Sequence, residues 1–225
     1  MADDFAIRLA RLDCCAVSDA LDQLALPASV SGIGSLAGHR RIAGTVITVE
    51  LAAGKPPAAL PARHLCTTAI EMAKAGQVIV VEQRTGIECA GWGGILSNAA
   101  HLRGLAGVIV EGLARDIDEA NAIGFTVYAR GATARTARGR IHEAATGMPI
   151  VVGDVKVATG DWVIADASGT AFVPFGRIGD VLDAAEHIAF KEAGMTKAVS
   201  TGHPISQVMG ANYECLLDQK PGQVG

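Results

Sequence analysis

The sequence predicts an α/β protein with a central parallel βαβ core and additional antiparallel strands. Three apolar runs, QVIVVE, ILSNAAHLR and AGVIVE, follow one another with the lengths of a strand, a helix and a strand. Hydrophobic residues make up 50% of the chain and aromatic residues only 4%, which favours close packing of small side chains between helices and a sheet. After residue 140, short β-prone runs alternate with Gly and Asp turns, as they do in antiparallel strands.

Helices are expected to open the chain and a strand to follow. Residues 4–25 carry apolar side chains at helical spacing, and Ser18 or Asp19 is a candidate cap for a second short helix within them. Residues 41–51, RIAGTVITVEL, are rich in β-branched side chains and predict a strand. Residues 52–64 contain three prolines, so we expect a loop there, in the role of a mobile flap.

The middle of the chain alternates helical and strand patterns, which is typical of a parallel sheet. Helices are expected at residues 66–76, 95–104 and 117–124, and strands at residues 77–82, 106–112 and 125–131. The antiparallel segment is expected at residues 150–174, where Gly and Asp separate the β-prone runs.

An amphipathic helix is predicted near the C-terminus. Residues 177–194 place Ile178, Val181 and Leu182 on one face. Residues 200–225 show little pattern and are interpreted as a tail that packs on a partner subunit or frays. We therefore expect a single domain over residues 1–225, with its N-terminal helices in residues 1–25.

Charge and cysteine content narrow the classes of protein. The net charge is -4, the pI is near 5.8 and no block of Lys or Arg occurs, so a nucleic-acid-binding surface is not expected. The chain has no apolar run of about 18 residues, so a membrane span is not expected either. Its five cysteines show no CxxC spacing, which indicates reduced thiols in a cytoplasmic protein.

Glycine and charged residues gather at one predicted edge of the sheet. Gly93 and Gly94 stand at the start of the second helix, and Arg115 and Asp116 follow the strand after it. In a βαβ crossover both strands run the same way, so these two points share an edge. Ligands of open α/β sheets usually bind at that edge.

The residue types at this edge suit a small carboxylic acid. The free N–H groups of Ile95 and Leu96 at the helix start would attract an anion, and Gly93 and Gly94 would let it approach the backbone. Arg115 adds a permanently charged donor that suits the carboxylate of a 2-oxo acid.

Two carboxylates make the same edge a candidate metal site. Asp116 offers the hard oxygen ligand that Mg²⁺ or Mn²⁺ prefers, and Glu119 lies one helical turn away on the same face. The alternative is a surface ion pair between Arg115 and Asp116 in which Asp116 only caps a helix and Glu119 is solvated.

The spacing of these residues resembles a family signature. The pattern G-x20-R-D-x2-E is matched by Gly94, by Arg115-Asp116 after twenty intervening residues, and by Glu119 after two more. That pattern is typical of the RraA-like family, which contains the regulator of ribonuclease E activity A and the class II 4-hydroxy-4-methyl-2-oxoglutarate and 4-carboxy-4-hydroxy-2-oxoadipate aldolases. The stretches VSDALDQL, GTVITVE and GDWVIADASGTAFVP agree, and the resemblance covers roughly residues 13–200.

This resemblance implies an α/β/β/α sandwich-like fold, a homotrimer or hexamer, and a site between subunits. It also implies an aldolase that needs Mg²⁺ or Mn²⁺, forms pyruvate without a Schiff-base lysine and decarboxylates oxaloacetate. Arg115 would bind the pyruvyl carboxylate together with the amides of Ile95 and Leu96, and Asp116 would hold the metal. Many of the aldolases carry an acidic residue where this chain has Gly94, and Glu119 is expected to substitute for it.

Two other functions and several other residues remain open. The same resemblance allows a regulator that binds a ribonuclease, or an enzyme of the same fold that acts on another 2-oxo acid. The family implies a metal-bound water as the general base, and His64 and the pair His142-Glu143 are alternatives. The loop after the first strand of the βαβ unit is expected to face the site, with three candidate substrate contacts, Arg84, Glu88 and Trp92.

Overall fold

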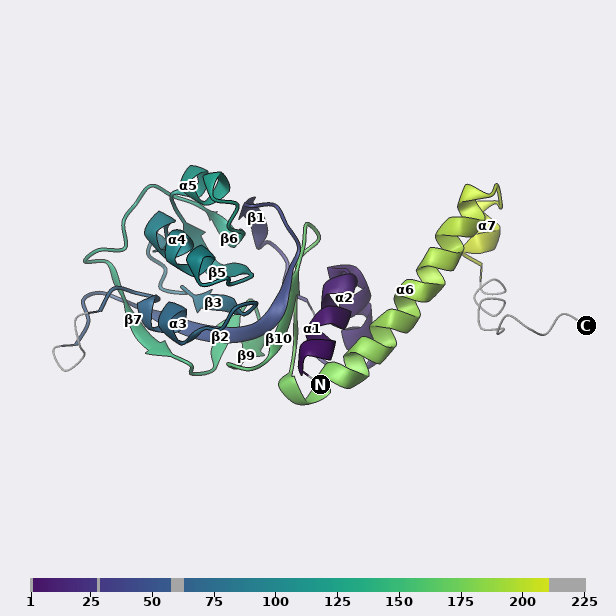
Figure 1. Cartoon of the computed structure of the whole chain (residues 1–225), viewed down its shortest axis with the longest axis horizontal. Coiled ribbons are helices and arrows are strands. Elements are labelled where there is room, and N and C mark those ends of the chain that lie inside the picture. The colour runs from purple at the N-terminus through teal and green to yellow at the C-terminus, as the bar shows by residue number, and fades with distance from the viewer. Residues whose placement is uncertain (1, 28, 58–62, 211–225) are drawn as a thin grey trace, which may run out of the picture.

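A strongly curled mixed sheet separates two groups of helices in the computed structural model, which describes residues 2–27, 29–57 and 63–210 (Figure 1). The helices are α1 (Ala2–Arg11), α2 (Cys14–Gln23), α3 (Thr67–Met72), α4 (Gly94–Leu102), α5 (Ile117–Ala122), α6 (Ile178–Ser200) and α7 (Ile205–Val208), with a 3₁₀ turn at Phe175–Arg177. The strands are β1 (Gly34–Ala37), β2 (Ile42–Ala53), β3 (Val78–Glu82), β4 (Ala90–Trp92), β5 (Gly107–Ala114), β6 (Val127–Ala132), β7 (Ile141–Thr146), β8 (Ile150–Val152), β9 (Val155–Val157), β10 (Trp162–Ala165) and β11 (Thr170–Val173).

The sheet combines a parallel centre with antiparallel margins. Its strand order is β1-β6-β5-β3-β2-β10-β11, with β4 paired to β5 and β7 paired to β2. Strands β2, β3, β5 and β6 run parallel, whereas β1, β7, β10 and β11 are antiparallel to their neighbours and β8 with β9 forms a separate hairpin. The predicted parallel βαβ core and the antiparallel segment after residue 150 are both confirmed.

Three apolar cores hold four layers together. One core joins the sheet to α3, α4 and α5 through residues such as Leu96 and Phe125. A second lies between the parallel strands and the strands from β8 to β11. A third packs α1, α2 and α6 against the outer face of β10 and β11, where Leu21 and Leu182 meet Ile164. Each fully buried Leu or Ile contributes about 1.5–3 kcal/mol, and the resulting order of layers is the expected α/β/β/α sandwich.

Several predicted helix limits are wrong for local reasons. Neither Ser18 nor Asp19 caps the second helix, because Asp13 precedes it and its side chain accepts a hydrogen bond from the Ala16 amide. Helix α3 stops at Met72 and not at Gly76, since the next residue is extended and the Lys74 amide donates to the Gln77 side chain.

Three short strands were not predicted. Strand β4 has only three residues inside an expected loop, so it carries no readable period. Strand β1 is a Gly- and Ser-containing segment that pairs with β6. Strand β7, IHEAAT, has a helix-like composition and becomes a strand through its pairing with β2.

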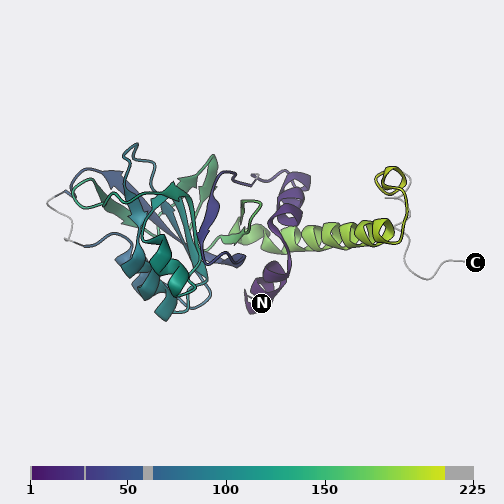
Figure 2. The ribbon, with the colours of Figure 1, turned by 90° about the horizontal axis from the view of Figure 1, so that it is seen from above.

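Helix α6 continues beyond its predicted end and leaves the body of the molecule. It has 23 residues, which is roughly 35 Å of helix, and its far end carries α7 away from the sheet (Figure 2). The apolar side chains of Phe190, Ile205 and Met209 are 61–69% exposed there. In the described part of the chain, no helix is long and apolar enough to cross a membrane. The predicted flap falls partly on residues 58–62 and the tail on 211–225, which lie outside the described residues.

Candidate functional site

A cleft of about 320 Å³ opens where β4 and β5 end. The Arg115 amide donates to the Trp92 carbonyl at 3.0 Å, so the two strand ends are held side by side. The cleft is lined by Gly93, Gly94, Ile95, Leu96, Arg115 and Asp116, and on its other side by residues of the segments 63–65 and 136–142. Its volume is at the low end of the range for small-molecule sites, about 300–1,000 Å³.

Asp116 connects the two strand ends through its carboxylate. Its Oδ2 atom accepts the Gly94 amide at 2.9 Å and lies 3.2 Å from Nε of Arg115. Asp116 has a left-handed backbone, φ 59°, and does not cap its own helix α5, so it caps α4 instead. A Cβ at Gly93 would lie 2.9 Å from Oδ2, which explains why a glycine stands there. The side chains of Arg115 and Asp116 are 38% and 30% exposed, so the predicted ion pair exists and faces the cleft.

Two backbone amides at the start of α4 are available to a ligand. Within the described residues, the N–H groups of Ile95 and Leu96 have no acceptor, and helical bonding begins at Ser97, whose amide donates to the Gly93 carbonyl at 3.0 Å. Such amides attract anions because of their partial positive charge. They lie beside the guanidinium of Arg115, whose Nη atoms have no partner among the described residues.

Glu119 fills the space that a side chain at position 94 would take. A Cβ built on Gly94 would lie only 1.8 Å from Oε2 of Glu119 and 3.0 Å from Cβ of Asp116. The side chains of Asp116 and Glu119 therefore both lie next to Gly94, the first residue of α4. Glu119 itself lines a neighbouring hollow that it shares with Arg115, Asp116 and Thr133.

This pair of carboxylates fits a hard divalent cation that retains water. No group of three or more His, Cys, Asp or Glu side chains with metal-binding geometry occurs in the described ranges. Mg²⁺ does not need such a group, because it keeps several waters and is commonly bound through one or two carboxylates. The cradle above Gly94 offers Asp116 and Glu119 for that purpose.

The imidazoles named as candidate bases both line the cleft. The Nδ1 atoms of His64 and His142 lie 3.1 Å from the Leu65 carbonyl and 3.2 Å from the Gly54 carbonyl. A carbonyl only accepts, so each Nδ1 is the donor, and each Nε2 has no hydrogen-bond partner in the described part of the chain. Glu143 has a different place: its carboxylate accepts the Cys66 amide at 2.5 Å and the Thr146 hydroxyl at 2.6 Å.

The three loop candidates are placed differently from one another. Trp92 lines the cleft but is 1% exposed, and its indole N–H donates to Ser97 at 2.9 Å. Arg84 donates to the Gly153 carbonyl at 3.3 Å and Glu88 pairs with Arg135 at 3.2 Å, and neither residue lines the cleft.

Gln83 was not predicted as a site residue, yet its side chain connects the loop before β4 to strand β5. Its side chain is buried, donates to the Cys89 carbonyl at 2.5 Å and accepts the Leu113 amide at 3.2 Å. A Cβ at Gly91 or Gly112 would lie 2.7 or 2.6 Å from its Oε1, so these glycines make room for it. A polar residue directly after an apolar strand and before a glycine-containing loop was the available signal.

Burial makes two thiols poor nucleophiles. Loss of solvation raises the pKa of Cys14 to about 12 and raises the pKa of Cys66 well above its usual value. The thiolate is the reactive form, so neither is suited to covalent catalysis near neutral pH. The free cysteines of the described chain include these two and Cys89, all buried, and the exposed Cys15, whereas Cys215 lies outside the described residues.

The chain is similar to a family described as "RraA-like: Aldolase/RraA" over residues 14–171. A protein of Halalkalibacterium halodurans, named "Putative 4-hydroxy-4-methyl-2-oxoglutarate aldolase", is 29% identical over 201 residues, which cover 88% of this chain and 89% of that protein. Protein DlpA of Legionella pneumophila is 24% identical over 191 residues, or 85% of this chain, and the chain spans only 31% of DlpA.

Solved structures share the architecture. An uncharacterised protein from Pseudomonas syringae is 26% identical with a TM-score of 0.82, covering 93% of this chain and 98% of that protein. The RNA-processing inhibitor RraA from Thermus thermophilis is 27% identical with a TM-score of 0.58, covering 70% of this chain and 92% of that protein.

Proposed function

The chain belongs to the RraA-like family, and from this premise we propose that it is a metal-dependent lyase that releases pyruvate. Its substrates would be 4-hydroxy-2-oxo acids of the 4-hydroxy-4-methyl-2-oxoglutarate or 4-carboxy-4-hydroxy-2-oxoadipate type, cleaved by a retro-aldol reaction, and oxaloacetate would be decarboxylated. The observation that carries the proposal is the convergence of the Asp116 carboxylate, the Arg115 guanidinium and the start of α4 on one cleft.

The chain's own groups would bind and orient the oxo acid. The free amides of Ile95 and Leu96 would receive the C1 carboxylate, and Arg115 would donate to that carboxylate and to the 2-oxo oxygen. Asp116 holds Nε of Arg115 at 3.2 Å, so the guanidinium is oriented before the substrate arrives. Negative charge develops on the 2-oxo oxygen in both reactions, and one preorganised donor to such an oxygen contributes about 3–4 kcal/mol.

Asp116 and Glu119 would hold a Mg²⁺ or Mn²⁺ ion at the cradle above Gly94. When bound, the ion supplies Lewis-acid stabilisation of the negative charge on the substrate oxygen. In the retro-aldol reaction the C4 hydroxyl also loses a proton. The free Nε2 atoms of His64 and His142 are the imidazole acceptors that line this cleft.

A coupled assay for pyruvate tests the proposal. Wild-type protein with Mg²⁺ should release pyruvate from oxaloacetate and from a 4-hydroxy-2-oxo acid, and removal of the ion with EDTA should stop both reactions until Mg²⁺ is restored. Arg115→Ala should lower the rate by roughly 10²–10³. Arg177→Ala is the matched control, because Arg177 is ion-paired with the exposed Asp180 outside the cleft. Wild-type protein without pyruvate release, or activity indifferent to EDTA, would overturn the proposal.

We propose further that the protein assembles as a homotrimer or hexamer through the α6 arm. The arm leaves the apolar side chains of Phe190, Ile205 and Met209 exposed, and in the proposed assembly a second copy of the chain covers them. Light scattering after gel filtration should give a mass three or six times that of one chain. A monomer at micromolar concentration would contradict the assembly.

The second candidate is a regulator that binds a ribonuclease. It is favoured by the likeness to a structure named as an RNA-processing inhibitor, at 27% identity. A regulator does not need the carboxylate pair above Gly94. Capture of ribonuclease E by a protein that also fails the pyruvate assay would favour this candidate over the lyase.

A further inference from the structure

The wall of the cleft opposite α4 carries positive charge that the reaction at Arg115 does not use. We propose that Arg138 and Arg63 form a second anion subsite there, which binds a further carboxylate of the substrate. The inference rests on the proposed function and deepens it. It assigns to Arg138 and Arg63 the selectivity for oxo acids that carry a carboxylate at C4.

The charge in the cleft is unbalanced in a chain that is acidic as a whole. The net charge of the protein is -4, yet the cleft lining formed by the described residues includes three arginines and a single carboxylate, that of Asp116. Arg115 is paired with that carboxylate at 3.2 Å. Arg63 and Arg138 have no acidic partner in the described ranges, so the excess of positive charge belongs to the wall that they form.

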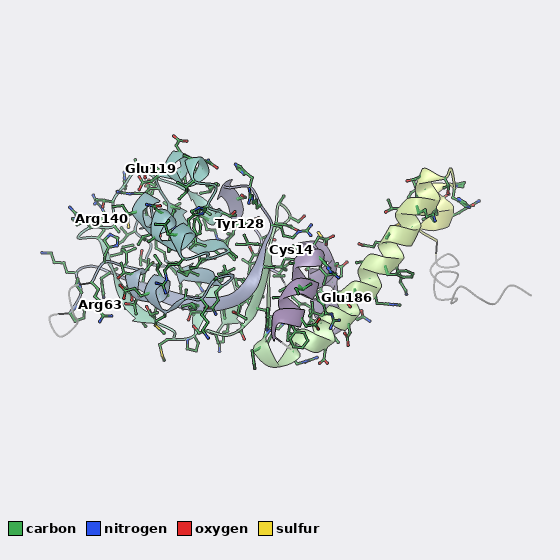
Figure 3. All side chains as sticks on the ribbon, viewed as in Figure 1. Cys14, Arg63, Glu119, Tyr128, Arg140 and Glu186 are labelled. Carbon is green, nitrogen blue, oxygen red and sulfur yellow. The ribbon has the colours of Figure 1, made fainter. Side chains whose placement is uncertain are left out.

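Both guanidiniums keep donors that have no partner among the described residues. Arg138 lies in the connection from β6 to β7, where its amide donates to the Thr136 hydroxyl at 3.2 Å, and its side chain has no partner among the described residues. Among the described residues, Arg63 donates only to the hydroxyl of Thr68, at 3.1 Å. Figure 3 shows Arg63 at the end of the molecule away from α6.

Guanidinium groups suit carboxylates because two parallel N–H donors match the two oxygens. The pyruvyl end of the substrate would occupy the α4 amides and Arg115, so a carboxylate attached at C4 would extend toward the opposite wall. In the retro-aldol step the C3–C4 bond breaks, its electron pair stays on C3 and the C4 hydroxyl becomes a carbonyl. The proton lost from that hydroxyl is balanced by protonation of C3, so no oxidant is required and the second product keeps its carboxylate at the subsite.

Two substrates that differ only at this carboxylate provide the test. 4-Hydroxy-2-oxoglutarate yields pyruvate and glyoxylate, whereas 4-hydroxy-2-oxopentanoate carries a methyl group instead and yields pyruvate and acetaldehyde. We expect kcat/KM of wild-type protein to favour the first substrate at least tenfold. Arg138→Met and the double variant with Arg63→Met should reduce this preference by about 10–100-fold, mainly through KM.

Arg135→Met is the control, because Arg135 lies in the same connection but pairs with Glu88 and does not line the cleft. It should keep the wild-type preference. Equal kcat/KM values for the two substrates in wild-type protein, or an unchanged preference in Arg138→Met, would overturn the subsite.

Calorimetry tests the second anion subsite even if the protein has no lyase activity. If neither substrate yields pyruvate, the proposed lyase activity fails, and the subsite is judged by binding of 2-oxoglutarate against 2-oxobutyrate in the presence of Mg²⁺. Tighter binding of 2-oxoglutarate that Arg138→Met abolishes would support the subsite. Equal affinities of the two acids for wild-type protein would refute it.

Discussion

Replacement of Asp116 by Asn or by Ala separates its structural contribution from its chemical one. Oδ2 of Asp116 accepts the Gly94 amide at 2.9 Å and faces Arg115 at 3.2 Å, in a residue with φ 59°. Asn retains an acceptor for the amide and tolerates the left-handed conformation, but it removes the negative charge. Ala removes the acceptor and also strains the backbone.

The magnitudes follow from these contacts. A hydrogen bond to a charged group contributes about 1.5–3 kcal/mol, a partly exposed ion pair contributes less than about 1 kcal/mol, and a left-handed Ala costs about 1 kcal/mol. Asp116→Ala should therefore lower the free energy of unfolding by about 3 kcal/mol, and Asp116→Asn by about 1 kcal/mol. The rate of pyruvate release should fall by a factor of about 10²–10³ in both variants, because neither side chain has the negative charge that holds the cation and orients Arg115.

Urea unfolding and the coupled pyruvate assay measure the two effects on the same samples. The expected pattern is a large loss of activity in Asp116→Asn with little loss of stability. If Asp116→Asn releases pyruvate within about threefold of wild-type protein, the carboxylate has no chemical role. If the two variants are equally stable, neither the contact with the Gly94 amide nor the left-handed backbone of residue 116 affects stability as expected.

Two further predictions concern metal binding and pH. Gly94→Ala should displace the Glu119 carboxylate, since the new Cβ would lie 1.8 Å from Oε2, and should raise the Kd for Mn²⁺ by about 10–100-fold; an unchanged Kd in calorimetry would contradict this. Burial raises the pKa values of Cys14 and Tyr128 to about 12, so their protonated forms stabilise the fold below about pH 9 and this contribution is lost as the pH rises toward 12. Urea unfolding should give a lower free energy of unfolding at pH 10.5 than at pH 8, and this difference should be smaller in Cys14→Ala.

The sequence was sufficient to predict the part of the site that lies on the parallel core. Apolar runs at strand and helix lengths place Gly93 and Arg115 at the ends of neighbouring elements, and a parallel sheet brings such ends together. The α/β/β/α architecture followed from the family resemblance, and the structure confirms it with cores on both sides of the sheet.

The opposite wall of the cleft could not be predicted in this way. Arg63 and Arg138 come from segments about 75 residues apart, which meet because β7 pairs with β2. Strand β7 has a composition that favours a helix, so its sequence gives no sign of that pairing. Gln83 was missed for a related reason: its role depends on β4, a strand of three residues without a readable period.

The central claim is that a divalent cation and a 2-oxo acid bind together at the start of α4. A crystal structure with Mn²⁺ and oxalate, a dianion that resembles the pyruvate enolate, tests it most directly. We expect an anomalous manganese peak beside Asp116 and Glu119, with oxalate on the amides of Ile95 and Leu96 and on the Arg115 guanidinium. Manganese and oxalate bound elsewhere, with this cleft empty, would contradict it.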